Sequence, residues 1–173
     1  LDPLTLSTLP PGARHLFLGT GNDLVEALFK EAEAHKEDGE ESYMDKFVQQ
    51  PGLGLKPQRT MIGGQYNGPE LRLVLQAAAD GKLPEEIEDR EVIAAYCAAI
   101  LDFHGLCVGK QLDQNYKARI QNFRDRFFAV YDLQKFGEKR DLVAATVKVH
   151  IAFSHVEDYM DATGQTLYTA EIG

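Results

Sequence analysis

EKRDLVAATVKVHIAFSHVEDYMDAT is the sequence of residues 138–163, and its apolar residues recur with the period of an α-helix. Successive apolar positions are three or four residues apart, which places them on one narrow arc of a helix. They are Leu142, Thr146, Val149, Phe153, Val156 and Met160. Gly137 and Gly164 flank the stretch, and glycine commonly ends helices because it reaches positive φ without steric cost. The stretch therefore predicts a long helix that faces a hydrophobic core.

Helical patterns fill most of the remaining chain. We expect further helices near residues 23–35, 43–49, 69–81, 85–108 and 112–136. The segment from Val92 to Val108 is apolar over nearly half of its circumference, so we expect it to lie at the centre of the fold. The predicted fold is all-α, a single-domain bundle of about five helices whose last three form the core.

Two segments are expected to lie outside the helices. Residues 1–21 contain three prolines and the turn-like Gly19-Thr20-Gly21, and they are predicted to form an irregular arm. Residues 50–69 are rich in glycine and proline and predict a long loop across one end of the bundle. Both segments belong to the single helical domain predicted for residues 1–173.

Charge and cysteine content limit the classes of function. The chain of 173 residues carries a net charge of −9, which makes nucleic acid an unlikely partner. Cys97 and Cys107 are ten residues apart in one predicted helix, a separation of about 15 Å that a disulfide cannot span. We therefore expect free thiols and a cytoplasmic or other reducing compartment. No apolar run reaches the roughly 18 residues of a membrane span, and no membrane partner is expected.

The Gly/Pro-rich loop is a candidate ligand site. Gly63 and Gly64 would let backbone amides approach a ligand, and Lys56 and Arg59 would supply positive charge. The loop matches neither the Walker pattern nor the dinucleotide GxGxxG pattern. The acidic run KEDGEES, residues 36–42, lacks the ligand spacing of a calcium loop and is interpreted as a solvated surface.

A second candidate surface lies on the helix expected at residues 112–136. Lys117, Arg124, Phe128 and Tyr131 form a stripe of charges and aromatic rings along one flank. Such a stripe can stack bases while pairing phosphates, dock an acidic partner helix, or cover the edge of the core with side-chain stems and rings. It is taken as the candidate partner-binding surface.

Two histidines are candidate ligands. His104 lies inside the apolar arc of its helix, between Ile100 and Cys107, and His150 lies on the flank of the arc of residues 142–160. A buried neutral imidazole and an axial haem ligand both fit such positions. A zinc site at His104 and Cys107 lacks further ligands at suitable spacing, so no metal site is expected.

The end of the chain carries a resemblance. His150 on a late helix is followed by Tyr159 and by Thr163-Gly164-Gln165-Thr166, and Gly63-Gly64 lies upstream. This arrangement resembles the C-terminal part of the indoleamine and tryptophan 2,3-dioxygenase superfamily. The resemblance implies bound haem with His150 as axial ligand and residues 163–166, including Thr163, Gly164 and Thr166, near the substrate. The family shows Gly-Thr-Gly-Gly in that segment and an arginine where this chain has Val147.

Two functions follow from these patterns. The first is a non-enzymatic helical module for protein interaction or assembly, with a protein partner or self-association and no cofactor. The alternative is a haem-binding protein that uses His150 or His104 as axial ligand.

Overall fold

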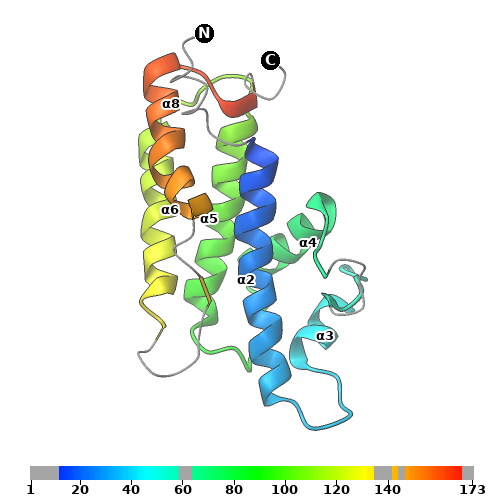
Figure 1. Cartoon of the computed structure of the whole chain (residues 1–173). Helices are drawn as coiled ribbons and strands as arrows, with labels where there is room; N and C mark the ends of the chain where they lie inside the picture. Colours follow the sequence, from blue (N-terminus) through cyan, green and yellow to red (C-terminus); the bar gives the residue numbers. More distant parts are fainter. Residues whose placement is uncertain (1–11, 59–63, 135–141, 144–146, 169–173) are drawn as a thin grey trace.

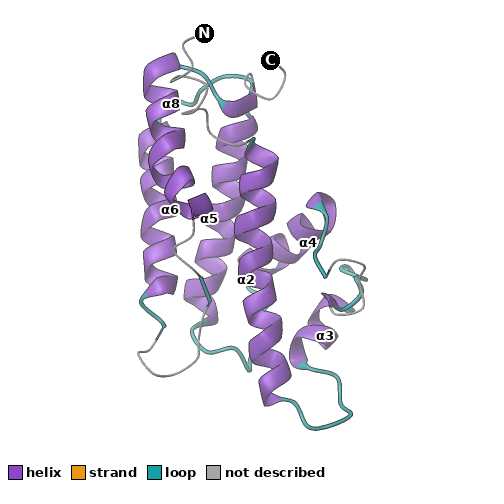
Figure 2. Cartoon of the chain, viewed as in Figure 1, coloured by secondary structure: helices purple, strands orange, loops and turns teal. Residues whose placement is uncertain are grey.

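The computed structural model describes residues 12–58, 64–134, 142–143 and 147–168. Every regular element in these ranges is a helix (Figure 2). The elements are α2 (Ala13–His35), α3 (Tyr43–Val48), α4 (Gly68–Ala79), α5 (Arg90–Val108), α6 (Tyr116–Tyr131), α7 (Val147–His150), the π-helix η2 (Ile151–His155) and α8 (Val156–Thr163). The predicted all-α bundle is confirmed (Figure 1).

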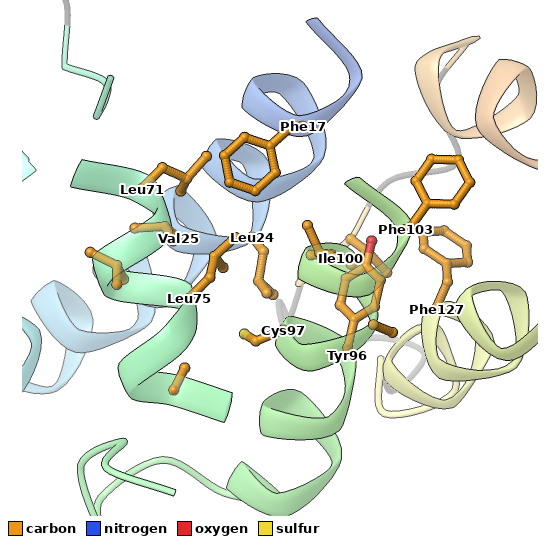
Figure 3. Packing of buried hydrophobic residues seen from close by; sticks show 14 of the residues in the cluster. Phe17, Leu24, Val25, Leu71, Leu75, Tyr96, Cys97, Ile100, Phe103 and Phe127 are labelled. Carbon is orange, nitrogen blue, oxygen red and sulfur yellow. The ribbon is translucent and has the colours of Figure 1, made fainter. Parts of the chain in front are cut away.

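Helix α5 is central, as its apolar sequence predicts. It packs against α6, α4 and α2, and it presents Cys97 toward α4 and Tyr96 toward α6 (Figure 3). Its length and its mean hydropathy of 1.6 are sufficient for a membrane span, so the expectation that no segment reaches this length is wrong. The three neighbouring helices account for this composition, because a core helix needs an apolar surface on several sides.

The contact between α5 and α6 is aromatic. The rings of Phe103 and Phe123 are stacked with their centroids 4.6 Å apart, and Tyr96 lies 5.9 Å from Phe123 and 6.0 Å from Phe127. Burial raises the pKa of the neighbouring Cys97 thiol to about 12 and also raises the pKa of the Tyr96 hydroxyl. Cys97 and Cys107 are both buried free thiols, so the prediction that they form no disulfide is confirmed.

Helix α2 begins ten residues earlier than expected. The predicted irregular arm is wrong for residues 13–21, which form the first turns of α2, and residues 1–11 lie outside the described ranges. Glycine lowers helix propensity by about 1 kcal/mol, but a Cβ on Gly21 would lie 2.7 Å from Leu71 Cδ2 of α4. Gly21 therefore permits the close approach of α2 and α4, and packing outweighs the local preference.

The stretch at residues 138–163 is helical only in part. Within the described residues, the helix begins at Val147 with α7, passes through the π-helical turn η2 and continues as α8. Leu142 and Val143 are buried but do not belong to a helix. Val149, Val156 and Met160 are buried as predicted. Thr146 and the Phe153 side chain lie outside the described structure. β-Branched residues are frequent in this stretch, and their low helix propensity is consistent with the shorter helix.

Candidate functional site

The Gly/Pro-rich loop is anchored to the middle of α2 by one buried side chain. Asn22 donates a hydrogen bond from Nδ2 to the carbonyl of Tyr66, and the Tyr66 amide donates back to Asn22 Oδ1, both at 3.1 Å. The Tyr66 hydroxyl donates to the carbonyl of Lys56 at 2.7 Å, and burial raises its pKa. At the other end, the Leu55 amide donates to the carbonyl of Val48 in α3. The described parts of the loop are thus fixed to α2 and α3.

A cleft of about 360 Å³ lies between this loop and the two helices that hold it, and we call it the loop cleft. Its lining residues come from α2, α3 and the loop, and they are Glu26, Phe29, Lys30, Glu33, Asp45, Gln58 and Gly64. The Phe29 ring lies 6.4 Å from that of Tyr66, so the anchored loop end supports the apolar part of the lining. Gly64 adopts φ +66, a conformation that favours glycine.

Asp45 has a structural role at the edge of this cleft. Its Oδ2 accepts a hydrogen bond from the Ser42 amide, and its own amide donates to Ser42 Oγ. This capping box begins α3 and holds a fully buried carboxylate in place. Asp45 therefore both positions α3 and adds negative charge beside the loop cleft.

Gln58 is the unusual polar residue of the cleft. Its side chain is only 5% exposed, and Nε2 has no hydrogen-bond acceptor among the described residues. A primary amide has two N–H donors, and leaving a buried donor without an acceptor costs about 1–3 kcal/mol. The loop cleft therefore contains a hydrogen-bond donor that no described residue of the chain accepts from.

The surface around the cleft is strongly acidic. We call residues 26–46 the acidic lobe, which comprises the second half of α2, the following turn and most of α3. It contains eight carboxylates and three lysines, a net charge of −5 within a chain of −9. Glu26 pairs with Lys30 at 3.3 Å and Glu33 pairs with Lys36 at 2.7 Å. The pair of Glu26 and Lys30 is exposed, so its contribution to stability is small, whereas Lys36 is partly buried.

The residues predicted for the loop are only partly brought to this cleft. Gly64 lines the cleft. The Lys56 side chain is exposed, and the main-chain carbonyl of Lys56 accepts the hydrogen bond from the Tyr66 hydroxyl. Arg59 and Gly63 lie outside the described residues. No sequence pattern predicted a site role for Asn22, Phe29 or Gln58. An asparagine next to the apolar arc of a helix was the available signal for Asn22, because buried polar groups require a defined partner.

The predicted flank of α6 separates into two parts. Lys117 pairs with Asp161 at 3.5 Å and Arg124 pairs with Glu157 at 2.5 Å, and both contacts hold α8 against α6. Tyr116 also donates a hydrogen bond to Asp161. Phe128 and Tyr131 are 50% and 43% exposed, and the ring of each packs against Phe127. The role of this flank in partner binding stays a prediction.

The two candidate histidines lie in different surroundings. The ring of His104 stacks on Phe17 of α2 at 4.4 Å, whereas His150 is exposed and its ring lies 5.3 Å from that of His155. Thr163 and Gly164 end α8, and Thr166 is buried and donates to the carbonyl of Gly109. These contacts give the segment after α8 a structural role, and the haem hypothesis stays a prediction.

A larger hollow of about 520 Å³ lies at the turn between α5 and α6. Its one cationic lining residue, Arg119, donates to both carboxylate oxygens of Asp102 and to Asp113. The hydrogen bond to Asp102 raises the pKa of Arg119, so its charge is already engaged within the fold. Among the described residues, no group of three or more His, Cys, Asp or Glu side chains is arranged to hold a metal ion.

Comparison with protein-family models, curated proteins and solved structures finds no match for the chain. The assignment of a site therefore depends on the geometry alone, and the loop cleft combines a cavity, a concentration of charge and an unused buried donor.

Proposed function

We propose that the protein is a non-enzymatic interaction module whose acidic lobe binds a basic segment of a partner protein. The observation that carries this proposal is the position of the loop cleft within the most acidic part of the chain. A cleft gives a partner an apolar contact, and the surrounding carboxylates attract positive charge.

The acidic lobe is accessible to a partner in the structure. Glu26 and Glu33 have side chains that are 45% and 50% exposed, and both border the loop cleft. Helices α6 and α8 lie on the far side of α2 from α3 (Figure 1). A partner bound at α3 therefore leaves the aromatic contact of α5 and α6 undisturbed.

Binding to this surface has a physical signature. Electrostatic attraction between exposed charges falls as salt is added, because the Debye length shortens from about 10 Å at 0.1 M to about 3 Å at 1 M. We expect a short lysine- and arginine-containing peptide to bind the protein and to dissociate as ionic strength rises. A glutamate-containing peptide of equal length is expected not to bind.

Two matched variants locate the binding surface. The variant with Glu26→Gln and Glu33→Gln loses two carboxylates that pair with cations of the peptide. Each exposed ion pair contributes about 0.2–1 kcal/mol, so the affinity for the peptide is expected to fall about two- to thirtyfold. The variant with Asp132→Asn and Asp158→Asn removes the same charge from the C-terminal cap of α6 and from α8, and it is expected to bind nearly as wild type. Fluorescence anisotropy measures both affinities.

Equal weakening in the two variants would show a general charge effect and would exclude the acidic lobe as a specific surface. Failure of the wild-type protein to bind the basic peptide at low salt would contradict the proposed function itself.

A further inference from the structure

We infer that the loop cleft takes one lysine or arginine side chain of the partner together with a neighbouring main-chain carbonyl, and that Gln58 Nε2 donates to that carbonyl. This inference rests on the proposed function and names the chemical group that enters the site. The juxtaposition of Gln58, Phe29 and two exposed carboxylates carries it.

The donor determines half of the ligand chemistry. Gln58 Nε2 is buried and has no acceptor among the described residues, and Gln58 is one of the residues that line the cleft. A hydrogen-bond acceptor on the ligand completes the amide, and a peptide main chain offers a carbonyl at every residue. A ligand that carries only cations offers no acceptor, so it makes no hydrogen bond with Gln58 Nε2.

The carboxylates and Phe29 determine the other half. An ammonium or guanidinium group between Glu26 and Glu33 is attracted by both, since residues seven apart lie on one face of α2. The methylene stem of the same side chain packs against the partly buried Phe29 ring, where a cation is also favoured by the ring face. Lysine and arginine combine a stem and a cation on one residue.

The ion pair of Glu26 with Lys30 does not prevent this arrangement. Lys30 pairs with Glu26 while 76% of its side chain is exposed, and such pairs are readily exchanged. The incoming cation therefore replaces an exposed intrahelical partner of Glu26, and the Gln58 donor gains an acceptor that it lacks among the described residues.

Gln58→Leu tests the assignment, because it removes the donor and keeps approximately the shape of the side chain. The substitution is expected to weaken binding of the basic peptide about tenfold, the loss of one hydrogen bond. It is also expected to raise the melting temperature of the free protein by about 2–4 °C, because a buried donor without an acceptor is removed. Gln65→Leu, at an exposed position of the same loop, is the matched control and is expected to leave peptide affinity nearly unchanged.

A second probe separates the two halves of the ligand. Spermine carries amines but no carbonyl, so its binding is expected to depend on Glu26 and Glu33 and to be indifferent to Gln58→Leu. A peptide whose lysines are acetylated keeps the carbonyls and loses the charge, and it is expected not to bind.

Three results would overturn the inference. They are equal peptide affinity of Gln58→Leu and wild type, a lowered melting temperature of Gln58→Leu, and an equal effect of this substitution on spermine and peptide. If the variant with Glu26→Gln and Glu33→Gln still binds the peptide more weakly when one of these results is obtained, the proposal of binding at the acidic lobe is retained. Only the role assigned to Gln58 in the loop cleft is then rejected.

Discussion

Two regions of the molecule differ in how completely their side chains find partners within the fold. One is the contact between α5 and α6, and the other is the surface formed by α2, α3 and the loop. Around Phe123 the rings stack on one another, and the thiol of Cys97 stays protonated in an apolar setting. Around Gln58 a buried amide lacks an acceptor among the described residues, and carboxylates lie at the rim of a cleft.

Under the proposed function, the first region serves stability and the second serves binding. Fully packed apolar groups stabilise the fold, whereas a buried donor without an acceptor lowers its stability. We propose that a ligand supplies the acceptor that Gln58 lacks among the described residues. Four changes test this division, and they are considered from the largest expected effect to the smallest.

Phe123→Ala is expected to destabilise the protein by about 3–5 kcal/mol, because a buried ring leaves a cavity that the bundle cannot close. Phe128→Ala on the same helix removes the same ring from a half-exposed position and is expected to cost less than about 1 kcal/mol. Urea denaturation monitored by circular dichroism measures both values. Equal costs would show that the packing of the two rings is not as described.

Asn22→Leu is expected to cost about 2–4 kcal/mol, because the Tyr66 amide and carbonyl lose their buried partners. Asn122→Leu, at an exposed position of α6, is the control and is expected to stay within about 0.5 kcal/mol of wild type. Asn22→Leu is also expected to increase hydrogen exchange at the Tyr66 amide. If the exchange rate at Tyr66 does not change, Asn22 does not anchor the loop.

Alkaline pH is expected to weaken the bundle. The pKa of Cys97 rises from 9.0 to about 12 in the fold, so above pH 9 the unfolded chain releases a proton that the folded chain retains. Stability then falls by about 1.4 kcal/mol per pH unit for this group until about pH 12. Cys97→Ala removes this contribution, and the slope of unfolding free energy against pH is expected to become shallower. An unchanged slope would contradict the burial of the thiol.

Arg124→Gln is expected to cost about 1 kcal/mol, because a partly buried ion pair with Glu157 joins α6 to α8. Arg126→Gln, exposed on the same helix, is expected to change stability by less than about 0.5 kcal/mol. The difference is expected to shrink at high salt. If the two substitutions cost the same, the pair with Glu157 does not stabilise the docking of α8.

The sequence predicted the helices whose apolar residues repeat regularly within one continuous segment. Helices α4, α5 and α6 follow directly from repeated apolar positions, and the capping box formed by Asn67 and Glu70 marks where α4 begins. The start of α2 was not predicted, because Gly19 and Gly21 suggest a turn when read alone. The contact of Gly21 with Leu71 joins positions fifty residues apart, and no local pattern contains it.

The candidate site was predicted as a loop in which Gly63 and Gly64 let backbone amides approach a ligand and Lys56 and Arg59 supply positive charge. Gly64 does line the cleft, but the residues that define its chemistry come from three elements, and their convergence depends on tertiary packing. Gln58 looks like an ordinary loop residue in the sequence, and its burial follows from the way the loop folds back on α2 and α3. Lys117 and Arg124 were predicted to contact a partner, and the structure shows intramolecular partners for both.

The pairing of Asn22 with Tyr66 has a consequence for how specificity can change. The loop is held at Leu55 by α3 and at Tyr66 by α2, so the intervening positions can vary in sequence and length while the two attachment points stay fixed. The free energy of closing a loop grows only slowly with the number of residues. This region is therefore suited to grafting. If the proposed function holds, exchanging the segment between its attachment points is expected to alter which partner is bound and to leave the helical scaffold unchanged.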